Sequence, residues 1–113
     1  MAVGQRGLVQ HAAVSVSSIG DNTIVAAVAG KLITVVGLLL VNGVATAQSV
    51  TVKDGTGGTA LSGAMPLNTA GFPLFLDEKT DFDYYSTSNP ANNLVLNLSA
   101  ATLVAGTIWY IQQ

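Results

Sequence analysis

One histidine and many scattered hydroxyl side chains are the residues of this sequence that could support nucleophilic catalysis. A serine or threonine nucleophile needs a neighbouring base, and the sole histidine is His11, at the start of an alternating segment. No G-x-S-x-G motif, which exposes a serine on a sharp turn, occurs in the sequence. His11 is therefore interpreted as structural or exposed, and we expect no enzymatic activity and no cofactor.

Four carboxylates within seven residues form a second group with ligand-binding chemistry: Asp77, Glu78, Asp81 and Asp83. Hard cations such as Ca²⁺ favour clustered carboxylate oxygens. The spacing differs from that of an EF-hand loop, and Lys79 lies inside the group. A solvated loop is therefore favoured over a calcium site, and we expect no bound metal.

Aromatic residues follow the acidic segment directly, at Tyr84 and Tyr85. Aromatic rings supply a large contact area together with a polar group, which suits carbohydrate stacking as well as protein interfaces. Asp81, Asp83, Tyr84 and Tyr85 are thus a candidate surface for a glycan or another exposed contact. Packing of the rings in the core or in an interface is the favoured alternative, and it applies to Trp109 as well.

Neither phosphate binding nor nucleic-acid binding is indicated by the glycines and basic residues. The segment 54–63, DGTGGTALSG, lacks the G-x-x-x-x-G-K-[ST] pattern and precedes a predicted strand instead of a helix. The four basic residues are scattered at Arg6, Lys31, Lys53 and Lys79 and form no basic patch. Nucleic acid is therefore not expected as a direct partner.

Composition indicates one small domain with an unusual surface. The 113 residues suit a single core, and only 9% of them are charged, against about 25% in a typical soluble domain. Ser, Thr, Asn and Gln must supply most of the polar exterior. Because the net charge is only -2, copies of the chain repel each other weakly, which favours association.

Short alternating segments separated by turn residues predict an all-β domain. Residues 94–99, for example, place three leucines on one side and polar residues on the other. Strands are expected at about 11–17, 23–28, 32–41, 47–53, 59–67, 72–76, 94–99 and 103–113. We therefore predict an antiparallel eight-stranded β-sandwich of the jelly-roll type over residues 11–113, preceded by an extended N-terminal arm over residues 1–10.

Turn residues and one proline refine this expectation. Asn42-Gly43 is a strong signal for a two-residue hairpin turn, and residues 19–23, IGDNT, are a turn cluster. Pro73 cannot donate a hydrogen bond to a neighbouring strand, so it indicates a strand start or a sheet edge.

Residues 31–49 have the layout of an export signal: a basic residue, an apolar run and the small residues Ala45 and Ala47. Thirty residues precede this stretch, and cleavage would discard two predicted strands. The unbroken apolar run is ten residues long, whereas a membrane-spanning helix needs about 20. A buried strand is therefore favoured over both an export signal and membrane contact.

Two predicted strands are apolar on both faces: residues 32–41, and the last strand, in which Val104, Ile108 and Tyr110 oppose Leu103, Trp109 and Ile111. A two-sheet sandwich buries only one face of each strand. A neighbouring subunit could cover the other face, which favours a homotrimer; loops of the same chain are the alternative. The residues expected at this oligomer interface are Leu38, Leu40, Trp109 and Ile111.

Three segments resemble small virion proteins of tailed bacteriophages: residues 20–35, 59–67 and 94–111. The resemblance is to decoration (cement) proteins and fibre-head domains, which have jelly-roll folds, assemble as trimers and are similar in architecture to tumour necrosis factor. It implies a structural protein on the outer surface of the capsid. The alternative that it implies is a tail- or head-fibre domain binding a host-surface glycan.

A decoration protein would stabilise the shell by binding the major capsid protein. The N-terminal arm is the candidate for this contact because it lacks a sustained strand or helix pattern. The arm residues expected to contact the capsid are Val3, Arg6, Leu8 and Val9.

Overall fold

Ten strands and no helix make up the part of the chain that the computed structural model describes, residues 8–67, 73–77 and 83–113. Five strands form sheet A: β1 (Gln10–Val16), β3 (Ile33–Asn42), β7 (Pro73–Leu76), β8 (Tyr85–Ser86) and β10 (Val104–Gln112). Five form sheet B: β2 (Gly20–Val25), β4 (Gln48–Asp54), β5 (Thr59–Ala60), β6 (Met65–Leu67) and β9 (Leu94–Leu98).

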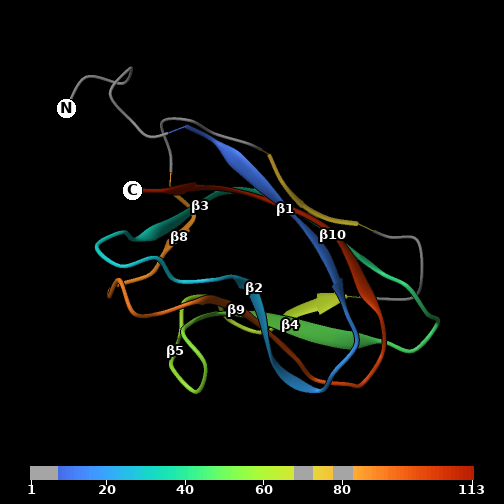
Figure 1. The fold of residues 1–113 in the computed structure, drawn as a ribbon. Coiled ribbons are helices and arrows are strands. Elements are labelled where there is room, and N and C mark those ends of the chain that lie inside the picture. Colours follow the sequence, from blue (N-terminus) through green and yellow to red (C-terminus); the bar gives the residue numbers. More distant parts are fainter. Residues whose placement is uncertain (1–7, 68–72, 78–82) are drawn as a thin grey trace.

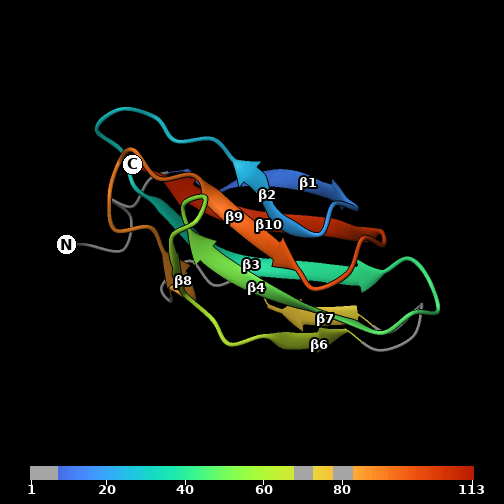
Figure 2. The same ribbon diagram turned by 90° about the horizontal axis from the view of Figure 1, so that it is seen from below.

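The two sheets face each other as two layers (Figure 1). In sheet A the order is β1-β10-β3-β7, and β8 pairs with β3 as well; in sheet B it is β2-β9-β4-β5, and β6 pairs with β4 as well. All pairs are antiparallel. Figure 2 shows β9 and β4 side by side in sheet B, in front of β10 and β3. The predicted all-β class with two antiparallel sheets is confirmed.

The core lies between the sheets and follows from the alternation of apolar residues. In β1, Ala12, Val14 and Val16 contact the core while His11 and Ser15 are exposed, as the sequence predicted. Every inward position of β9 is a leucine. The fully buried side chains of the core cluster include Ile33, Val35, Leu38, Leu40, Val50, Leu94, Leu96, Val104 and Ile108.

A β-bulge changes which residues of the segment 32–41 face the core. Trp109 pairs with Gly37, but Tyr110 pairs with Val35, so Val36 is an extra residue in β3. The extra residue reverses the alternation, and Val35 and Leu38 therefore both contact the core. The alternation of β3 after the bulge is thus opposite to the alternation before it.

Ten strands replace the predicted eight for two local reasons. The expected strand 59–67 is divided by residues 61–64 into β5 and β6, which both pair with β4. β8 was not predicted, because it is only two residues long and follows the acidic segment. Thr87 next to it is buried, and its Oγ1 accepts a hydrogen bond from the Ile33 amide at 2.9 Å.

The second predicted strand, 23–28, was misplaced because β2 begins at Gly20. The polar residues that suggested a turn at 19–23 lie mostly in β2, where their side chains form hydrogen bonds. The Asn22 side-chain amide donates to the carbonyl oxygens of Ser18 at 2.8 Å and Gly20 at 3.1 Å, which closes the turn between β1 and β2.

The predicted hairpin at Asn42-Gly43 is also wrong, because β3 and β4 belong to different sheets. Asn42 is buried, and its side-chain amide donates to the Thr46 carbonyl oxygen at 2.7 Å. The Gly43 amide donates to the Leu103 carbonyl oxygen at 2.8 Å. These bonds shape a longer connection that crosses from one layer to the other. Pro73, by contrast, begins β7 at an end of the sheet order, as predicted.

Gly106 is needed where β10 passes β3. A Cβ atom built on Gly106 would lie 1.8 Å from the carbonyl oxygen of Leu39, and the Gly106 φ is 152°. We expect Gly106→Ala to lower the free energy of unfolding by more than about 1 kcal/mol, because the strands must separate to admit the methyl group. Urea unfolding measures the change.

Gly63→Ala is the matched control, since nothing lies within 4 Å of a Cβ atom at that position. It should change the unfolding free energy by less than about 0.5 kcal/mol. Equal stability of the two variants would contradict the close approach of β10 and β3.

Candidate functional site

Three of the four residues predicted at an oligomer interface are buried within the single chain. Leu38 and Leu40 are 0% exposed and lie in the core between the sheets. Ile111 is 1% exposed. Side chains without exposed surface cannot contact another subunit, so this part of the prediction is wrong. Trp109 differs, because it lies on the opposite side of β10 from Ile108 and is partly exposed.

The strand register places a second set of residues on the side of sheet A that faces away from sheet B. Directly paired residues share a face of a sheet, which defines three rows across the strands. We call this surface the outer A face. Its rows are His11, Trp109 and Gly37; Ala13, Thr107, Leu39 and Phe75; and Ser15, Ala105, Val41 and Pro73.

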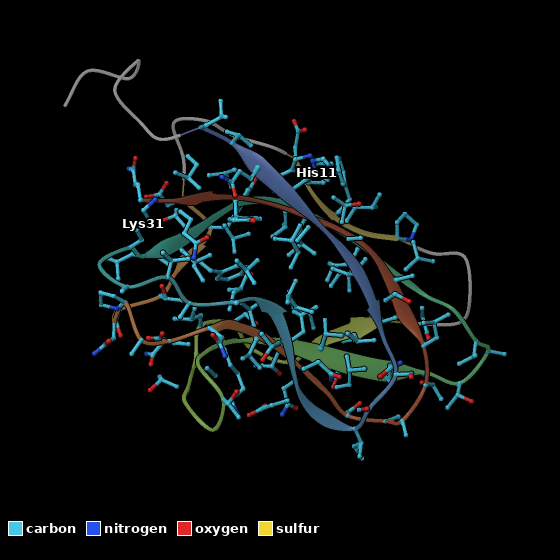
Figure 3. The ribbon with its side chains drawn as sticks, in the orientation of Figure 1. His11 and Lys31 are labelled. Atoms are coloured by element: carbon cyan, nitrogen blue, oxygen red, sulfur yellow. The ribbon has the colours of Figure 1, made fainter. Side chains whose placement is uncertain are left out.

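The outer A face is apolar and nearly free of ionisable groups. Phe75 is 54% exposed, and Leu39, Val41 and Trp109 are each partly exposed. His11 is the single ionisable residue in the three rows, and in Figure 3 it projects from β1 away from sheet B. A sheet face that is open to solvent ordinarily alternates to polar residues. This face therefore has the composition of a contact surface.

The outer face of sheet B is polar by comparison. Its rows contain Asp21, Asn97 and Thr51, and next to them Thr23, Val95 and Lys53. We call this surface the outer B face. The two outsides of the same protein thus differ strongly in polarity.

Asp21 is the centre of a hydrogen-bond network on the outer B face. Its carboxylate accepts hydrogen bonds from the Asn97 side-chain amide at 2.7 Å, the Gly57 amide at 2.7 Å and the Lys53 ammonium at 3.0 Å. These partners lower the pKa of Asp21 from 3.8 to about 2, with Asn97 the largest cause, followed by Gly57 and then by Lys53. The network joins β2, β9 and β4 to the turn after β4.

A second carboxylate, Asp54, joins the end of β4 to the segment before β9. Burial raises its pKa, but hydrogen bonds from Ser88 and Asn92 outweigh burial and hold the pKa below its usual value. The Asn92 side-chain amide donates at 2.9 Å and the Ser88 amide at 3.1 Å. Both carboxylates are satisfied by groups of the protein, which assigns them structural roles.

The two tyrosines of the predicted glycan surface have different surroundings. Tyr85 packs against the core from β8, and burial raises its pKa. Tyr84 is partly exposed and donates its hydroxyl hydrogen to the Asp77 carbonyl oxygen at 2.7 Å. Asp83 is exposed, and Asp81 lies outside the described residues. Tyr84 and Tyr85 therefore do not form one stacking surface.

Two arm residues can be placed, and two cannot. Leu8 is 82% exposed and Val9 is partly exposed, just before β1 begins at Gln10. Val3 and Arg6 lie outside the described residues. The capsid-contact role of the arm stays a prediction, and an apolar side chain as exposed as that of Leu8 suits such a role.

Within the described residues, no group of three or more His, Cys, Asp or Glu side chains could hold a metal ion. Glu78 and Asp81, half of the acidic cluster, are outside that part of the chain. Among the same residues, no helix has the length and hydropathy to cross a membrane. The run that resembled an export signal forms β3, the turn after it and the start of β4, while Lys31 lies in the exposed turn before β3 (Figure 3).

Comparison with known proteins gives no relative: no family model, no curated protein and no solved structure matches the chain. The site must therefore be judged from its own geometry. Sequence reasoning missed Leu39 and Val41 because it chose the other alternation of the 32–41 strand, and it also missed Phe75, which lies in β7. The network around Asp21 had no sequence signal, because its members are far apart in the chain.

Replacement of Asp21 tests the network through its pH dependence. Because the folded-state pKa is depressed, Asp21 contributes stability above its unfolded pKa, and the contribution is lost as the pH falls towards about 2. We expect Asp21→Asn to lower the unfolding free energy by about 1 to 2 kcal/mol at pH 7. Urea unfolding should show the difference shrinking between about pH 4 and pH 2.

Two further variants separate the partners of Asp21. Nuclear magnetic resonance titration of the carboxyl group should show a raised pKa of Asp21 in both Asn97→Ala and Lys53→Ala, because each side chain lowers that pKa in the wild type. An unchanged pKa in Asn97→Ala would mean that the ion pair, and not the amide, holds the carboxylate.

Proposed function

We propose that this protein is a non-enzymatic structural subunit of a virion, which decorates the outer surface of a capsid as a homotrimer. The observation that carries the proposal is the difference between the two outer faces. The outer A face is apolar and almost uncharged, and the outer B face on the opposite side is polar and hydrogen-bonded. This difference suits a subunit that is covered by protein on one side and exposed to solvent on the other. The resemblance to phage decoration proteins agrees with this role.

We also propose that the two sheets form a jelly-roll sandwich. The pair β1 and β10 in sheet A continues into the pair β2 and β9 in sheet B, so one antiparallel ribbon runs across both layers. With β5 and β6 counted as one strand position, and β7 and β8 as another, the chain has eight positions distributed over both sheets. This wound ribbon is the arrangement that supports the proposal.

Decoration stabilises a shell by mass action. A protein that binds the assembled lattice and not the free shell subunits shifts the equilibrium toward the lattice. In this proposal the major capsid protein is the partner, and the exposed apolar side chain of Leu8 and the rest of the arm contribute to the contact. The protein then needs no catalytic group, metal or cofactor.

Particles with and without the protein test the decoration role. Particles that lack it should release their genome at a lower temperature, and adding the purified protein back should restore the release temperature. Fluorescence of a nucleic-acid dye during heating measures the release. An unchanged release temperature would contradict the proposal.

Removal of residues 2–9 is the companion variant, because it leaves β1 intact from Gln10. The shortened protein should fold with an unchanged unfolding temperature but bind particles more weakly in co-sedimentation. Binding equal to that of the full chain would separate the arm from the capsid contact. A host-glycan fibre role would instead give binding to cells or cell-wall glycans without any effect on shell stability.

A further inference from the structure

We propose that the outer A face is the surface through which copies of this chain bind each other. The proposal names the partner of one surface within the assembly role described above, and it rests on that role. It keeps Trp109 from the interface residues expected from sequence and replaces Leu38, Leu40 and Ile111 by residues that the strand register places on one open face. The central members of this set are Leu39, Thr107, Trp109 and Phe75.

Apolar groups are exposed in the middle of a regular sheet on the outer A face. In the second row, Ala13, Thr107, Leu39 and Phe75 lie side by side across four strands. These side chains are partly or largely exposed, and Phe75 reaches 54%. Covering them by another protein surface removes apolar area from water, which stabilises association.

The outer A face carries almost no charge, which favours a second copy of the chain as its occupant. The three rows contain no Asp, Glu, Lys or Arg, and His11 lies in the row at one end. A strongly charged partner would lose the hydration of its charges against this face and gain no opposite charge. The outer A face of another copy is equally apolar and free of these charges, so two such faces meet without an unpaired charge.

The outer B face is unsuited to be the main contact between copies. On the outer B face, Asp21 already accepts hydrogen bonds from Asn97, Gly57 and Lys53. Covering that network would remove water from charged groups whose partners are already in place, at a net cost. The polar side is therefore suited to solvent, and the apolar side to another copy.

The size of the outer A face sets the expected strength. Four strands about 4.8 Å apart and five residues of about 3.4 Å each give a projected area of about 330 Å². This flat footprint is small for an interface, since a standard interface buries about 800 Å² of accessible surface on each partner. Self-association in solution should therefore be weak and concentration-dependent, and strengthened where a capsid lattice holds the copies close together.

Sedimentation of the full chain between about 10 μM and about 1 mM tests the inference. The weight-average mass of the wild type should rise from 11.5 kDa toward three times that value as the concentration increases. Phe75→Lys and Thr107→Lys should each weaken association at least tenfold, because the new ammonium group would be buried against apolar side chains. Thr107→Lys keeps the test valid if the Phe75 variant fails to fold.

The matched control is Thr23→Lys, which adds the same charge at an exposed strand position of the outer B face. It should associate like the wild type, and the thermal unfolding of all the proteins should be compared in parallel. A wild type that stays at 11.5 kDa at about 1 mM, or lysine variants that associate as tightly as the wild type, would overturn the inference.

Particle and vesicle binding by the same variants separates this inference from the proposed function. If Phe75→Lys keeps its self-association but loses particle binding, the face contacts the capsid; the inference then fails and the decoration role stands. If the wild type stays monomeric and binds phosphatidylcholine vesicles, and the lysine variants lose this binding, the face contacts lipid. That result would overturn the inference. A mass that rises only to twice 11.5 kDa supports the face as a self-contact and contradicts the trimer.

Discussion

The structure depends on the pairing of β10 along both of its edges. β1 lies on one side and β3 on the other, so β10 holds the four-strand order of sheet A together. Close passage of the backbone leaves no room for a side chain at Gly106. The bulge opposite Trp109 and Tyr110 then decides which residues of β3 face the core. Both the interior and the open face of sheet A follow from this pairing.

Alternation along the strands gives the molecule two unlike exteriors. Inward positions are filled by Val, Leu and Ile in both sheets, which supplies the burial that a chain without disulfides needs. Outward positions divide by sheet: small and apolar residues on sheet A, and hydrogen-bonded polar residues on sheet B. On sheet B the outward positions include the ion pair between Lys53 and Asp21, with 3.0 Å between the ammonium and the carboxylate oxygen.

Regular strands were predictable from sequence, and irregular backbone was not. Alternation located β1, β4 and β9, and Pro73 marked the start of an edge strand. The bulge at Val36 has no local signal, because it depends on how β10 aligns with β3, and it reversed the predicted orientation of Leu38 and Leu40. The turn signal at 19–23 was misplaced because β2 begins at Gly20. The Asn42-Gly43 signal failed because the chain crosses there from sheet A to sheet B, in a connection where the Asn42 side-chain amide bonds to the Thr46 carbonyl oxygen. Two-sided hydrophobicity in the sequence indicated a contact face on this sheet. The residues of that face could not be identified, because the bulge has no local signal.

The central place of β10 also has a consequence for how the chain folds. Its two neighbours come from the first half of the sequence, so sheet A is joined by contacts between distant segments. Domains dominated by such non-local pairing close large loops before they gain stability, and they fold slowly. Until β10 inserts, the edges of β1 and β3 remain unpaired and can bind other chains. During synthesis the strand order therefore makes premature strand pairing the main hazard for this protein.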